Sequence, residues 1–108
     1  MNVFDDSWLG FLHCLIWRLG EVDEWLLHRI VYELSERKVI EVNNWTWFGK
    51  WPRSAEVDAA VALLEMVNAV EGDSNVIKAV KPPVKACELD DQVEAIIEEV
   101  VRKYRNAT

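Results

Sequence analysis

WTWFGKWPRSAEVDAAVALLEMV, residues 45–67, is the stretch that decides the fold. Its first part is aromatic and ends at Pro52, which keeps a helix from beginning earlier. Ser54 is a preferred N-cap residue, and apolar residues then recur at helical spacing up to Val67. We therefore expect a strand or an extended aromatic loop that leads directly into a helix over 54–67.

Two further helices are expected upstream of this stretch. The first begins at residue 5 or 6 and ends near Leu19, because Gly20 is a natural stop. A short turn then leads to Asp23, a second N-cap, and the next helix ends near residues 37–38. Helices joined by so few residues are antiparallel or crossed neighbours.

The rest of the chain predicts a small amount of β structure and one more helix. The β-branched run at 39–42 predicts a short strand. Two apolar runs around the polar turn 72–75 predict a β-hairpin, and a C-terminal helix is expected at 89–105. We expect one domain over 1–108, mainly α with a small β-hairpin (α+β), whose core spans 5–83.

The order helix, helix, strand, helix, hairpin, helix matches the winged-helix arrangement. The pattern LxxIVYxL at 27–34, the loop WFGKWPRS at 47–54 and the pattern VxxAVxxL at 57–64 resemble small archaeal and phage-associated winged-helix proteins. This resemblance covers about residues 8–83. It implies a helix-turn-helix core whose third helix enters the major groove of DNA, with the hairpin as a wing that touches the backbone.

Charge separates two interpretations of that resemblance. Twelve Lys and Arg face 19 Asp and Glu, and the formal charge of −7 argues against an indiscriminate nucleic-acid binder. Helix 54–67 holds no Lys or Arg, so phosphates would repel it, and its alanines suit a protein partner instead. Cations gather in the aromatic loop and the wing, which makes the candidate DNA contacts Lys50, Trp51, Arg53, Lys78, Lys81 and Lys85.

The tryptophans allow two interpretations. Interleaved with cations, those at 45–51 would stack bases. We favour the alternative, in which Trp47 and Trp51 fill the core beneath the third helix, since large aromatic residues gain most from burial. Trp25 lies off the main apolar stripe of its helix and is a candidate interface anchor.

The C-terminal helix has a heptad-like apolar seam, which predicts a homodimer. The alternative is that this helix packs back onto the first helix. The candidate dimer interface consists of Val93, Ile96, Ile97, Val100, Val101 and Tyr104.

The two cysteines belong to no metal or redox motif. Cys14 lies in an apolar helical run and Cys87 in a loop-like stretch, so we expect free thiols in a cytoplasmic protein. A disulfide is the alternative if the source is a hyperthermophile. No apolar run reaches the roughly 18 residues of a membrane span, and no signal peptide is visible at the N-terminus.

Catalytic motifs are absent from the sequence. His13 and His28 are the only histidines, and no HExxH, phosphate loop or GxSxG occurs. We expect no enzyme, no metal and no cofactor. The leading hypothesis is a winged-helix-like, DNA-associated or transcription-regulatory protein that binds double-stranded DNA. The alternative is a protein–protein interaction module that keeps the fold without binding DNA.

Overall fold

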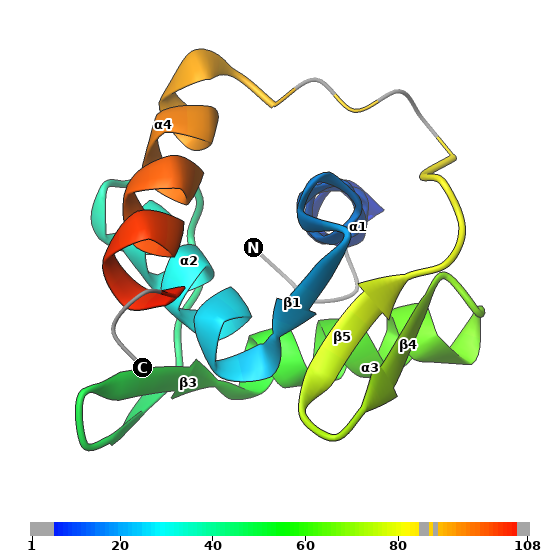
Figure 1. The fold of residues 1–108 in the computed structure, drawn as a ribbon, viewed down its shortest axis with the longest axis horizontal. Helices are drawn as coiled ribbons and strands as arrows, with labels where there is room; N and C mark the ends of the chain where they lie inside the picture. Colours follow the sequence, from blue (N-terminus) through cyan, green and yellow to red (C-terminus); the bar gives the residue numbers. More distant parts are fainter. Residues whose placement is uncertain (1–5, 85–86, 88, 106–108) are drawn as a thin grey trace.

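The computed structural model describes residues 6–84, 87 and 89–105, and it is an α+β fold, as expected (Figure 1). Its elements follow the order α1 (Asp6–Leu19), β1 (Glu21–Asp23), α2 (Glu24–Glu36), β2 (Trp45–Phe48), β3 (Trp51–Ser54), α3 (Ala55–Met66), β4 (Val70–Asp73), β5 (Val76–Ala79), α4 (Asp91–Val100) and a π-helical turn, Val101–Arg105. No helix in this described part is long and apolar enough to cross a bilayer.

The helices begin where the sequence places their caps. The Asp23 carboxylate accepts from the first backbone N–H groups of α2, the Ser54 hydroxyl caps α3, and Asp90 caps α4. Each cap satisfies backbone donors that the helix itself leaves without a partner. These local bonds explain why the three helix starts could be predicted.

In the described part of the chain, five short strands form two antiparallel sheets. The first has the order β1-β5-β4, and the second is the β2–β3 hairpin. The β4–β5 turn consists of Ser74 and Asn75, whose φ angles of 51° and 68° are those of a type I′ turn. The hairpin expected around residues 72–75 is therefore confirmed. Figure 1 shows β3 running into α3, with the three-stranded sheet towards the other end of that helix.

Two expectations about strands were wrong. Residues 39–42 form no strand, although Val42 is buried and Val39 packs against the core from this irregular segment. A β-branched side chain suits a buried loop as well as a strand, so composition did not discriminate. Conversely, residues 21–23, expected as a turn, pair with β5. A strand of three residues is too short to show a period.

The core lies between α1, α2, α3 and α4 and the inner face of the three-stranded sheet. α1 crosses near the centre of the molecule in Figure 1 and buries a broad apolar face. The large side chains that are less than 2% exposed include Trp8, Leu12, Leu15, Ile16, Leu27, Ile30, Leu34 and Ile97. Because all helices contribute, each is held mainly by tertiary packing.

α4 packs against its own chain, and the predicted dimer seam is wrong. Four of the candidate interface residues are at most 3% exposed, namely Val93, Ile96, Ile97 and Val100. The other two, Val101 and Tyr104, are half-buried against the same core. α4 lies beside α2, and not mainly against α1 as the alternative had it. A short apolar stripe indicates that a helix face is buried, but it does not indicate which segment buries it.

A disulfide joins Cys14 of α1 to Cys87 in the segment between β5 and α4, with the two Cα atoms 5.5 Å apart. The expectation of free thiols was therefore wrong, because the two residues are 73 positions apart and only the tertiary fold brings them together. Such bonds persist in oxidising compartments or inside hyperthermophiles. The disulfide weighs against an ordinary reducing cytoplasm.

We expect this disulfide to contribute much of the stability. Closing a loop of this length lowers the conformational entropy of the unfolded chain, which raises its free energy by up to about 4 kcal/mol. The double variant Cys14→Ser/Cys87→Ser should lose about 2–4 kcal/mol of unfolding free energy in urea. Reductant should lower the stability of the native protein by a similar amount and leave the double variant unaffected. A native unfolding midpoint that does not respond to reductant would contradict the expectation.

Candidate functional site

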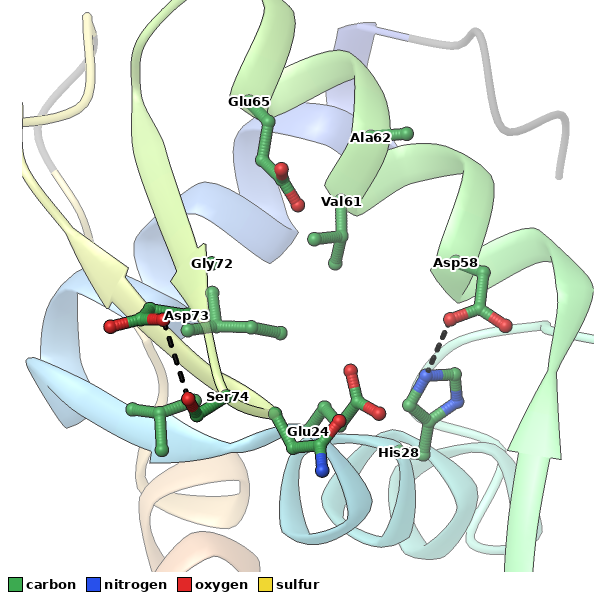
Figure 2. Close-up of a pocket in the computed structure, with 12 residues that line it drawn as sticks. Glu24, His28, Asp58, Val61, Ala62, Glu65, Gly72, Asp73 and Ser74 are labelled. Carbon is green, nitrogen blue, oxygen red and sulfur yellow. Dashed lines mark hydrogen bonds and ion pairs between the residues drawn. The ribbon is translucent and has the colours of Figure 1, made fainter.

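A pocket of about 260 Å³ opens between α3, the first turns of α2 and the β4–β5 hairpin (Figure 2). The α3 residues Asp58, Val61, Ala62 and Glu65 line it because spacings of three and four place them on one helix face. Glu24 of α2 and Asp73 of the hairpin lie on the other sides. The pocket therefore combines an apolar lining with carboxylates from three separate elements.

His28 is the most deeply buried polar residue among those that line this pocket, at 1% exposed. Its Nδ1 accepts the Ser54 backbone N–H at 3.0 Å, and its Nε2 lies 3.2 Å from Asp58 Oδ1. Since a nitrogen that accepts carries no proton, the proton of the neutral ring is on Nε2, which donates to Asp58. Burial lowers the pKa of His28, against the smaller opposing effect of Asp58. The imidazole is neutral at neutral pH.

Ser54, His28 and Asp58 lie together without forming a nucleophilic triad. The imidazole faces the backbone N–H of Ser54, whereas the Ser54 hydroxyl donates to the Asn43 carbonyl at 2.9 Å and accepts the Glu56 N–H at 3.1 Å. The serine is also completely buried. A triad needs its hydroxyl bonded to the imidazole. These contacts instead join α2 to the start of α3.

Arg53, a candidate DNA contact, is held in ion pairs beside the pocket. Its Nη1 donates to Glu24 at 2.9 Å, while Nε and Nη2 donate to the two oxygens of Asp58 at 3.2 and 3.0 Å. The hydrogen bond to Asp58, followed by that to Glu24, raises the pKa of Arg53 further above its ordinary value. The guanidinium lies 4.8 Å from the ring centroid of Trp25. Arg53 is thus committed to partners within the chain.

Two more candidate DNA contacts, Lys78 and Lys81, also have acidic or hydrogen-bonding neighbours within the chain. Lys78 on the central strand β5 stands directly opposite Glu21 of β1 and Glu71 of β4. Residues opposite one another share a face of the sheet, so two carboxylates flank this lysine. Lys81 donates to the Val67 carbonyl at 3.0 Å.

The remaining candidates do not gather into one surface. Lys50 is exposed in the turn of the β2–β3 hairpin, and its carbonyl accepts from Arg29. Trp51 is half-buried against Tyr104, with ring centroids 5.6 Å apart. Lys85 lies outside the described residues. The cations that sequence reasoning grouped are divided between the hairpin and the three-stranded sheet.

The hairpin tryptophans do not fill the core beneath α3, so that expectation was wrong. Trp47 is 49% exposed and Phe48 is 54% exposed. They cover α2 instead, where ring centroids lie 5.7 Å apart for Phe48 and Trp25 and 5.0 Å apart for Trp47 and Tyr32. Trp25, the candidate interface anchor, is consequently half-buried against its own chain.

Arg29 holds this aromatic layer together. Its guanidinium carbon lies 4.4 Å from the ring centroid of Tyr104 and 5.9 Å from that of Trp47. Nη1 donates to the Lys50 carbonyl at 2.9 Å, and Nη2 lies 3.2 Å from Glu33. Nε is buried and has no hydrogen-bond partner among the described residues. Cation–π attraction therefore joins α2, the hairpin and the C-terminal turn.

The acidic character of α3 is visible in the sequence, whereas the pocket is not. Glu24 lies on another helix, 34 positions before Asp58, and Asp73 lies in the strand that follows α3, so no helical period could have grouped them with the α3 carboxylates. Asp58 and Glu65, seven positions apart, were the one available signal. Among the described residues, no cluster of three or more His, Cys, Asp or Glu side chains is arranged to hold a metal ion.

Comparison with known proteins assigns this chain to no family. No protein-family model, no curated protein and no solved structure matches this chain. Its function therefore has to be argued from the chemistry of the surface itself.

The lowered pKa of His28 predicts a pH dependence of stability. In the unfolded chain this histidine titrates near its ordinary value of 6.5, above its pKa in the fold. Acid therefore protonates the unfolded state first, so the contribution of neutral His28 is present above about pH 6.5 and is lost as pH falls through the folded pKa.

Urea unfolding of the native protein and His28→Gln, each at about pH 7.5 and about pH 5, tests this sign. Acid also relieves repulsion among the surplus carboxylates of a chain with charge −7, but both proteins share that effect. We expect the native protein to lose more stability, or gain less, than the variant. Equal changes in the two proteins would refute the assignment.

Proposed function

We propose that this protein is a protein-interaction module built on a winged-helix arrangement, and that its pocket receives a basic side chain of a partner protein. One observation carries the proposal: the face between α3 and the β4–β5 hairpin is acidic, and Arg53, the cation beside it, is already paired with Glu24 and Asp58. That is the face through which a DNA-binding winged helix would meet phosphates.

The topology supports the winged-helix part of the proposal. β1 lies between the first two helices and pairs with the second strand of the hairpin that follows α3, giving the order β1-β5-β4. In such an arrangement α3 corresponds to the recognition helix and β4–β5 to the wing. The β2–β3 hairpin is then an insertion between the second and third helices.

The charges favour a protein partner over DNA. The pocket is lined by four carboxylates, those of Glu24, Asp58, Glu65 and Asp73. Arg53 pairs with Glu24 and Asp58, which leaves Glu65 and Asp73 without a salt bridge among the described residues. A phosphate backbone brought to this face would meet like charge, so its approach is unfavourable.

The lining also matches the two-part character of lysine and arginine side chains. Val61, Val76 and Ile77 offer apolar surface to the aliphatic stem, and the carboxylates offer acceptors to the charged head. At about 260 Å³ the pocket suits one long side chain rather than a whole element of secondary structure. A partner with an exposed basic segment satisfies both requirements.

Fluorescence anisotropy tests the proposal with a labelled Lys/Arg-rich peptide and a labelled DNA duplex, each at low and moderate salt. We expect the peptide to bind and the duplex to remain free. Glu65→Gln/Asp73→Asn should weaken peptide binding at least tenfold, about 1.4 kcal/mol, because it removes the two carboxylates without salt bridges. Asp91→Asn/Glu98→Gln removes two exposed charges from α4 and should have little effect.

Two results would contradict this function. Equal losses in both double variants would mean that the peptide responds only to net charge. Salt-sensitive duplex binding that is lost in Lys78→Glu/Lys81→Glu, and is not lost in the pocket variant, would establish the DNA interpretation instead.

A further inference from the structure

An aromatic row leads from the acidic pocket to the turn of the β2–β3 hairpin. Arg53, which is bonded to the pocket residue Glu24, lies 4.8 Å from the ring centroid of Trp25. The ring of Trp25 meets that of Phe48 edge to face, with centroids 5.7 Å apart. Phe48 stands opposite Trp51 in the hairpin, so these two side chains share one face of it. The contacts form a continuous path from the pocket to the turn.

Phe48, in the middle of this row, is its most exposed ring. It is 54% exposed, whereas Trp25 and Trp51 are half-buried. The edge-to-face contact with Trp25 covers only part of the phenyl ring. Because the neighbours of Phe48 are also aromatic, the exposed surface is a continuous apolar area of the kind that marks an interaction site.

Two lysines stand at the far end of the row. Lys50 Nζ lies 5.8 Å from the ring centroid of Trp51, and Lys103 Nζ lies 5.3 Å from that of Tyr104. The two rings are in contact, with centroids 5.6 Å apart, because the C-terminal turn lies beside the hairpin (Figure 1). The salt bridges between described residues involve neither lysine.

The charge therefore changes sign along the row. At the pocket end, Glu65 and Asp73 have no salt bridge among the described residues, and at the other end the two lysines have none. Glu99, which interacts electrostatically with Lys103, is already bonded to Arg37 through both of its carboxylate oxygens. A ligand that fits the whole surface must be positive at one end and negative at the other.

We propose, building on the proposed function, that the partner's basic side chain is carried on an extended segment that continues along this row. An apolar side chain of the segment packs on Phe48, and acidic side chains meet Lys50 and Lys103. Neighbouring groups along the row lie about 5–6 Å apart, so three steps span at most about 17 Å, which an extended chain covers with about five residues. The basic and acidic residues of the partner are separated by about that many positions.

A single nucleic-acid strand fits this surface less well. Its bases could stack on the rings, and its phosphates could meet the lysines. Its backbone is negative along its whole length, however, so the end that reached the pocket would face carboxylates. A segment with opposite charges at its two ends meets no such repulsion. The change of sign along the row therefore favours a peptide.

Fluorescence anisotropy with labelled peptides tests the proposal. Each peptide has two lysines at one end, a central tryptophan, and either two glutamates or two glutamines at the other end, and each is made in both chain orders. In the order that matches the site, the glutamates should tighten binding at least fivefold. The sign is decisive, because added negative charge would otherwise weaken binding to a chain of formal charge −7.

Variants of the protein locate this gain. Lys50→Gln/Lys103→Gln should remove the difference between the glutamate and the glutamine peptide. Lys78→Gln/Lys81→Gln changes the net charge equally at exposed positions elsewhere and should preserve the difference. Phe48→Ser should weaken both peptides alike, because each contains the tryptophan.

The readouts separate the segment from the pocket. If Glu65→Gln/Asp73→Asn weakens the glutamine peptide but the glutamates add nothing in either order, the pocket function stands and the extended segment is refuted. A gain that survives Lys50→Gln/Lys103→Gln also refutes the segment. If the glutamine peptide ignores the pocket variant, or does not bind up to about 1 mM, the proposed function fails and the segment fails with it.

A single-stranded oligothymidylate serves as the competing ligand. We expect it to bind more weakly than the glutamate peptide. Tighter binding that is lost in Lys50→Gln/Lys103→Gln would identify a nucleic-acid strand as the occupant and overturn the proposal.

Discussion

The hydrogen bond from the Ser54 N–H to the buried Nδ1 of His28 ties together the parts on which the surface chemistry depends. It holds the end of β3 against α2 at the residue that caps α3, so it sets where α3 begins. The same imidazole donates to Asp58, which in turn receives Arg53. Leaving this ring charged and buried would cost considerable free energy, so the arrangement requires a neutral His28.

Arg29 plays the corresponding part on the outer side of α2. Its guanidinium carbon lies within 6 Å of the ring centroids of Tyr32, Trp47 and Tyr104. The hairpin, which lacks a core of its own, is thereby attached to the body of the fold. A two-stranded hairpin alone is marginally stable, so this attachment explains how the β2–β3 hairpin remains ordered.

The distribution of charge follows from the same two arginines. Arg29 and Arg53 form ion pairs within the chain, and Lys78 is flanked by glutamates. The surface between α3 and the β4–β5 hairpin is left with carboxylates in excess. The chemical preference of this surface is set by its side chains, so function has to be argued from the site and not from topology.

The sequence by itself determined the four helices and the β4–β5 hairpin, because their signals are local: caps such as Ser54, the helical period and a polar turn act within a few residues. Only the tertiary structure decided what each face meets. The apolar face of α4 is buried against its own chain, Cys14 forms a disulfide with Cys87, and Glu94 pairs with Arg18, 76 positions away. Burial and charge pairing depend on which distant segments the fold brings together, and spacing along one helix carries no information about that.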